Sequence, residues 1–207
     1  MFNNAVDREK FDSKFNGFYR GEVVDVNDPL KAGRIKVRVF SVFDDIPVSV
    51  LPWAAYADPL MGGKDNGSLI VPQLNSHVYV FFEGGDHRYP VYFAGSPAIR
   101  NDVPDAPSES QANYPNNKVI KTQSGIVIEM DDTEGAVRFK IKHPSGTSME
   151  INNDGDVVDV VEGEHTISIS DDGTITIGGN ATINVTGDTN ITSGGIVNIQ
   201  GTMINLN

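Results

Sequence analysis

The sequence predicts an all-β protein, in which a small N-terminal barrel is followed by a repetitive stalk that several copies of the chain must build together. Short strands and turn signals fill residues 18–95. A proline-rich segment without apolar periodicity follows at 96–118. An apolar repeat with a period of eight residues runs through 151–207. We therefore expect an arm at 1–17, the barrel, a linker, neck strands at 119–150 and the stalk.

The barrel is expected because five or so short strands occur without a convincing helix. The segment 34–40 alternates strictly, with isoleucine and valines at 35, 37 and 39 directed inward and Lys36 and Arg38 outward. Prolines and glycines between 41 and 67 predict a long irregular connection. The expected strands are 18–26, 34–40, 68–72, 77–83 and 90–95.

The stalk repeat contains two apolar series and one glycine series, all in the same frame. The apolar residues are Ile167, Ile175, Ile183, Ile191 and Ile199, and, in the second series, Val161, Ile169, Ile177 and Val185. The turn glycines are Gly155, Gly163, Gly179, Gly187 and Gly195, with Asp171 in the one missing slot. Such short units cannot make a core within one chain, so we expect identical chains to wrap around one axis. The alternative is a threonine-rich strand array in an ordinary sandwich.

Composition excludes several classes of function. The net charge is −12 and the acidic residues are spread along the chain, which argues against nucleic acid as a partner and against adsorption to an anionic membrane. The absence of cysteine rules out disulfides, thiolate metal sites and a cysteine nucleophile. The first residues resemble no secretory signal, and no run approaches the ~20 apolar residues of a membrane helix.

Catalytic and metal-binding patterns are lacking as well. His77, His87, His143 and His165 are scattered without metal-ligand spacing. Copies of His165 could meet on the axis around an ion if this residue points inward, and a solvated turn is the alternative. The acidic residues at 131–134 fit an exposed turn better than a calcium loop. We therefore expect a non-enzymatic protein with no catalytic, cofactor-binding or metal-binding residues.

Several stretches resemble the central spike of contractile phage tails, a family that includes the tip proteins of type VI secretion systems. The stretches similar to its N-terminal OB-fold domain are 32–39, 51–54, 72–86 and 88–95. Residues 122–133 and 143–147 resemble the neck, and the octads resemble a triple-stranded β-helix. The resemblance implies a homotrimer with an OB-fold barrel, a neck and an intertwined triple-stranded β-helix. It further implies a virion tail-baseplate component, made in the host cytoplasm.

The family resemblance also implies a mechanical role. The barrel would dock on a trimeric hub protein, and the stalk would transmit force to puncture the envelope, with transient contact with the host outer membrane. Some relatives carry a lysozyme domain between barrel and helix, but residues 96–118 are too few for one. Others end in iron-binding histidines, whereas this chain ends with apolar Met203, Ile204 and Leu206. That ending implies a separate conical tip protein of the PAAR type.

Alternatives remain at this point. The same parts would suit the tip protein of a type VI secretion or extracellular injection system. A cell-wall hydrolase would need a carboxylate pair in a groove, but the octads offer mostly Thr, Asn and Ser. A receptor- or glycan-binding tail module would usually expose aromatic residues along its stalk, and none follows Phe139.

Overall fold

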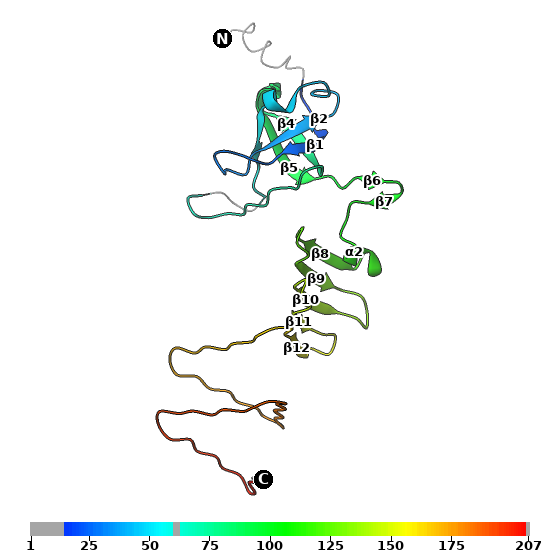
Figure 1. Cartoon of the computed structure of the whole chain (residues 1–207). Coiled ribbons are helices and arrows are strands. Elements are labelled where there is room, and N and C mark those ends of the chain that lie inside the picture. Colours follow the sequence, from blue (N-terminus) through cyan, green and yellow to red (C-terminus); the bar gives the residue numbers. More distant parts are fainter. Residues whose placement is uncertain (1–14, 60–62, 206–207) are drawn as a thin grey trace, which may run out of the picture. The chain divides into compact units, whose positions relative to one another are not determined.

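The computed structural model describes residues 15–59 and 63–205 (Figure 1). The chain divides into two units, 1–163 and 164–207, and each is described by itself. Most of the expected N-terminal arm lies outside the described residues. None of the helices in the described ranges has the length and apolar character needed to cross a membrane.

Five strands close into the predicted barrel (Figure 1). They are β1 (Tyr19–Asp25), β2 (Ile35–Val39), β3 (Trp53–Tyr56), β4 (His77–Phe82) and β5 (Pro90–Gly95). The order around the barrel is β1-β2-β3-β5-β4, and β4 pairs with β1 to close it. The pair β3–β5 is parallel and the others are antiparallel. Single-turn 3-10 helices lie at Val48–Val50 and Glu83–Gly85.

The barrel interior follows directly from strand alternation. On β4, Val78, Val80 and Phe82 are buried, while the residues between them are partly exposed. Successive side chains on a strand point to opposite faces, so this pattern directs one face into the core. The largest fully buried side chains of the barrel are Val23, Ile35, Val39, Val78 and Val80.

The β1–β2 connection is held by the buried carboxylate of Asp28. It accepts hydrogen bonds from the backbone amides of Leu30 (3.0 Å) and Ala32 (2.8 Å) and from the Arg34 guanidinium (2.6 Å). The hydrogen bonds from Arg34 lower the pKa of Asp28 well below its usual range. A loop without regular structure is thereby fixed next to the barrel wall.

Lys36 lies on the outer face of β2, as expected, but it is not exposed to solvent. Its side chain is covered, and its ammonium donates to the carbonyls of Val48 (2.8 Å) and Ser49 (3.0 Å). Arg38, on the same face of β2, donates to the carbonyl of Phe43 at 2.9 Å. The β2–β3 connection folds over the outer face of β2, so two basic side chains satisfy its carbonyl groups.

Two of the expected barrel segments are also corrected. The residues at 68–72 form no strand, whereas Trp53–Tyr56, inside the expected irregular connection, forms β3. The reason is non-local: β3 pairs with β2 on one side and lies parallel to β5 on the other. An apolar run alone cannot show which of two segments obtains these partners.

The segment 96–118 is not wholly irregular. It contains a small hairpin, β6 (Ile99–Arg100) and β7 (Val103–Pro104), and one helical turn, α2 (Glu109–Ala112). The neck that follows is an antiparallel meander (Figure 1). Its strands are β8 (Asn117–Lys121), β9 (Val127–Asp131), β10 (Arg138–Lys142), β11 (Ser148–Ile151) and β12 (Val157–Val160).

The neck sheet extends past the boundary expected at residue 150. The turn between β11 and β12 is built by Asn152, whose carbonyl Oδ1 accepts the amides of Asp154 (3.0 Å) and Asp156 (2.9 Å). Gly155 takes a φ of +84° in this turn, which glycine adopts without steric cost. This local turn lets β12 pair back on β11 within one chain.

The second unit has a different character. Among its described residues, 164–205, no strand pairs with another within the chain. Extended stretches alternate with bends, and bends occur at Gly163, Asp171, Gly179, Gly187 and Gly195. The backbone therefore bends at the same eight-residue interval as the repeat in the sequence.

Candidate assembly surfaces

The first apolar series of the octads is exposed along its whole length. Its members, Ile167, Ile175, Ile183, Ile191 and Ile199, are 65–86% exposed. Full burial of one such side chain is worth about 1.5–3 kcal/mol relative to leaving it in water. Isolated exposed isoleucines are unremarkable, but here five at a constant spacing all lack cover inside the chain.

The second series behaves in the same way, with somewhat lower exposure. Its members are Val161, Ile169, Ile177 and Val185, all exposed. Ile169, Ile177 and Val185 each lie two residues after a member of the first series, so the two series share one face of an extended chain. The intervening Thr and Asn residues lie on the other face.

The turn glycines do not all share one backbone conformation. Among the octad glycines only Gly155 has a positive φ, and Gly163, Gly179, Gly187 and Gly195 bend the chain with negative φ values or extended geometry. A left-handed conformation, which glycine adopts without steric cost, therefore explains the glycine at 155 but not the other four. Of the expected tip contacts, Met203 and Ile204 are exposed. Leu206 lies outside the described residues.

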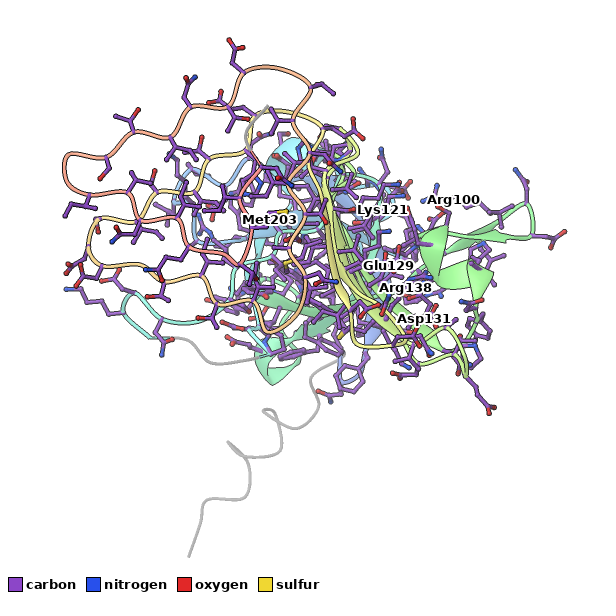
Figure 2. All side chains as sticks on the ribbon, turned by 90° about the horizontal axis from the view of Figure 1, so that it is seen from below. Arg100, Lys121, Glu129, Asp131, Arg138 and Met203 are labelled. Atoms are coloured by element: carbon purple, nitrogen blue, oxygen red, sulfur yellow. The ribbon has the colours of Figure 1, made fainter. Side chains whose placement is uncertain are left out.

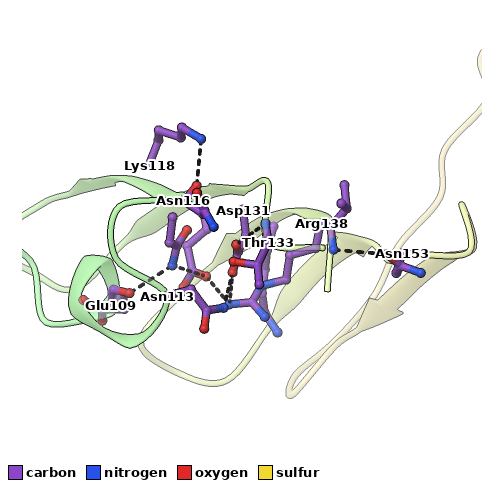
Figure 3. A network of polar contacts seen from close by, with 12 residues as sticks. Glu109, Asn113, Asn116, Lys118, Asp131, Thr133, Arg138 and Asn153 are labelled. Atoms are coloured by element: carbon purple, nitrogen blue, oxygen red, sulfur yellow. Dashed lines mark hydrogen bonds and ion pairs between the residues drawn. The ribbon is translucent and has the colours of Figure 1, made fainter. Parts of the chain in front are cut away.

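A buried polar network on the neck sheet was not foreseen from the sequence (Figure 3). Asp131 is fully buried and accepts hydrogen bonds from the Asn113 amide (2.6 Å) and from the backbone amide of Thr133 (3.0 Å). Arg138 donates to Glu129 at 2.9 Å. Figure 2 shows Glu129, Asp131 and Arg138 close together. Of the acidic residues at 131–134, expected in an exposed turn, Asp132 and Glu134 are exposed, whereas Asp131 is buried and anchors the network.

Hydrogen bonding explains the electrostatics of this network. The bonds from Thr133 and Asn113, together with the charge of Arg138, lower the pKa of Asp131 from 3.8 to about 2. The pKa of Arg138 is raised, chiefly by its hydrogen bond to Glu129. Both groups are therefore charged at neutral pH, and their charges compensate each other inside the fold.

The segment before the neck covers the same face of the sheet. The Asn117 amide donates to the Glu109 carbonyl at 2.9 Å, and the Lys121 ammonium donates to the Glu109 carboxylate at 2.7 Å. The turn α2 is thereby tied to β8. The sequence indicates this network only in part. The alternation of charged and apolar residues on β10 is visible in it, but the packing of α2 over the charged face is not.

The four histidines are not brought together as a site. His143 accepts the backbone amide of Ser145 at 3.1 Å in a local turn, and His77 begins β4. Within the described part of the chain, no three His, Cys, Asp or Glu side chains are placed to share a metal ion. His165 is exposed in the single chain, and its place relative to an axis of several chains stays a prediction.

Comparison with known proteins finds a family that matches the barrel. Residues 19–96 match the family described as the type VI secretion system/phage-baseplate injector OB domain. The matched residues span all five strands of the barrel. The observed barrel order, closed between β1 and β4 with a parallel β3–β5 pair, agrees with the match. The predicted OB-fold and the resemblance to baseplate spikes are thus confirmed for the injector OB domain.

One curated relative comes from a phage. A stretch of 53 residues is 45% identical to Protein Gp5 of Vibrio phage KVP40. The aligned stretch covers 26% of this chain but only 13% of the relative. The family match ends at residue 96, so neck and stalk lie outside it.

Proposed function

We propose that this chain is the structural central spike of a contractile tail baseplate, and that it works as a homotrimer. Three copies would intertwine residues 151–207 into a triple-stranded β-helix. The injector OB domain would dock on a trimeric hub protein, and the stalk would transmit axial force to puncture the host envelope. The role is mechanical and involves no catalysis or cofactor.

The observation that carries this proposal is the exposed first octad series, at 65–86% exposure. Identical chains offer identical octads, so each isoleucine finds equivalent isoleucines at the same height on its neighbours. Strand edges that are bare in one chain would pair between chains, which supplies stiffness and removes an aggregation hazard. A triple-stranded β-helix would therefore both cover the isoleucines and pair the strand edges.

Two further surfaces support contacts with other proteins. The injector OB domain exposes a run of apolar side chains, Leu69, Ile70, Val71 and Leu74, which would suit a hub contact. At the other end of the chain, Met203 and Ile204 are exposed, and repetition in three copies would make an apolar platform. We propose that this platform, together with Leu206, receives a PAAR-type tip protein.

A second candidate function stays close to the first. The matched family covers type VI secretion systems as well as phage baseplates, so a tip protein of a secretion or extracellular injection device is supported by the same match. The Vibrio phage relative favours a virion tail baseplate. Contact with the host outer membrane would be transient, and nucleic acid is not proposed as a partner.

The test is the oligomeric state of matched variants. Ile183→Asp would place three charges inside the assembly, and burying an unpaired charge is strongly unfavourable. Thr182→Asp, on the opposite face of the same stretch, is the control. Light scattering of full-length protein should give a trimer for the wild type and for Thr182→Asp, and monomer or aggregate for Ile183→Asp. A normal Ile183→Asp trimer would overturn the proposal.

A further inference from the structure

One end of the barrel carries an apolar cavity. Because β1 is antiparallel to both β2 and β4, the start of β1, the end of β2 and the turn between β4 and β5 meet at this end. The cavity has a volume of about 560 Å³. Most of its wall comes from the β2–β3 connection, which contributes Val42, Phe43, Ile46, Val50 and Pro52. The cavity therefore belongs to the injector OB domain alone.

The wall of this cavity is fixed by hydrogen bonds to its backbone. The Arg38 guanidinium donates to the carbonyls of Phe43 (2.9 Å) and Ile46 (3.0 Å), and the Lys36 ammonium donates to two carbonyls further along the same connection. Phe43 is buried against the barrel core, whereas Ile46 and Val50 are 38% and 68% exposed. Part of a well-anchored apolar wall therefore has no cover among the described residues.

Aromatic rings complete the border of the cavity. Phe15 and His87 both line it, and their ring centroids are 5.6 Å apart in an edge-to-face arrangement. Phe15 also lies edge-to-face against Phe82 at 5.6 Å, and Phe43 does so at 5.8 Å. Aromatic pairs at such separations attract each other beyond the gain from burial alone. One more ring entering the cavity would extend this cluster with the same geometry.

The chain itself has such a ring within covalent reach. Residues 1–14 lie outside the described residues, and they lead directly into Phe15 at the border of the cavity. Phe11 precedes Phe15 by four residues, so bond geometry keeps the two Cα atoms within about 14 Å of each other. All other residues between Val6 and Phe15 are polar or charged. Phe11 is therefore the apolar side chain of this segment that is tethered most closely to the cavity.

We propose that Phe11 docks in this cavity, so that the N-terminal arm of the chain closes the end of its own barrel. A short tether gives the arm an effective concentration of the order of millimolar at the cavity. An apolar segment of another protein would need a similar concentration, or much tighter binding, to displace it. Docking would cover the exposed side chains of Ile46 and Val50. This contact lies within one chain and does not depend on how the stalk assembles.

Thiol reactivity at the cavity wall provides the test. The wild type contains no cysteine, so Ile46→Cys introduces one thiol inside the cavity. Tyr89→Cys introduces one at the same end of the barrel but outside the cavity wall, at a position that is 57% exposed. In full-length protein under native conditions, adding Phe11→Ala should speed reaction of the thiol at position 46 at least about tenfold, because access would no longer require the arm to open. The rate at position 89 should stay the same. Phe2→Ala, in the same arm but 13 residues before Phe15, is the matched control and should change neither rate.

The remaining outcomes would each overturn docking of Phe11 in its own barrel. These are an unchanged rate at position 46 with Phe11→Ala, an equal acceleration at position 89, or an equal effect of Phe2→Ala. An arm supplied by a second copy has its own signature. Assembly of the Ile46→Cys, Phe11→Ala chain with an excess of wild-type chains would then restore slow reaction. Val50→Cys, on the same cavity wall, gives the same readout if Ile46→Cys does not fold.

Discussion

Gly21 on β1 has no room for a side chain, and its replacement offers a quantitative test of the fold. A Cβ at this position would lie 2.5 Å from Val37 Cγ1, 2.7 Å from the Arg38 carbonyl oxygen and 2.9 Å from Val39 Cα. Two of these three atoms belong to the backbone of β2, which pairs directly with β1 and cannot rotate away. Gly21→Ala therefore requires a strand to move.

The expected cost of Gly21→Ala follows from overpacking. Inserting one methyl group into a filled interior costs about 1–3 kcal/mol. With a urea m-value of about 1–3 kcal/mol per molar, the unfolding midpoint should fall by roughly 1 M. Gly17→Ala is the matched control, because no atom lies within 4 Å of its Cβ position. That substitution should be neutral or stabilising by up to about 1 kcal/mol.

The assay reports on the barrel alone. Trp53 is the only tryptophan in the chain and lies on β3, so its fluorescence follows unfolding of the barrel rather than of the neck or stalk. Equal urea midpoints for Gly21→Ala and Gly17→Ala would refute the close packing of β1 against β2.

Two other predictions concern the stalk and the neck. Ile175→Ala should lower the free energy of unfolding by about 2–5 kcal/mol per chain if the octads are buried between copies, whereas a residue that stays exposed would change it by at most about 0.5 kcal/mol. Concentration-dependent thermal unfolding measures this, with Thr174→Ala as control, and equal midpoints would contradict burial. In the neck, the pKa of Asp131 falls from 3.8 to about 2 on folding, so its ionised form stabilises the fold above about pH 4 and that stability is lost as the pH falls toward 2. Asp131→Asn should therefore flatten the dependence of the melting temperature on pH between about 4 and 2, and an unchanged slope would show that Asp131 does not contribute.

Local periodicity was sufficient for most of the barrel. Alternation correctly located β2 and β4, because side-chain direction along a strand repeats every two residues regardless of what the strand pairs with. It gave the outward direction of Lys36 but not its cover, which comes from residues 48–49, and it missed β3, whose partners are distant in sequence. Such errors arise wherever a long connection folds back over a strand.

The candidate site divides in the same way. The octad series is visible in the spacing, and its members are exposed in the single chain, while their burial between copies stays a prediction. Which face of the neck sheet is covered could not be predicted. Alternation separates charged from apolar residues on its strands, but it does not show which of the two faces another segment packs against. Only the cover supplied by α2 and Asn113 identifies the charged face as the occupied one.

The sequence by itself determined the order of the parts, the eight-residue frame and the face on which the apolar residues lie. These features depend on covalent spacing and on the two-residue period of an extended chain. Tertiary structure decided which segments close the barrel, which carboxylates are buried and which side of the neck remains open. Those features depend on contacts between residues far apart in the chain, and the free energy of such contacts is not encoded in any one segment.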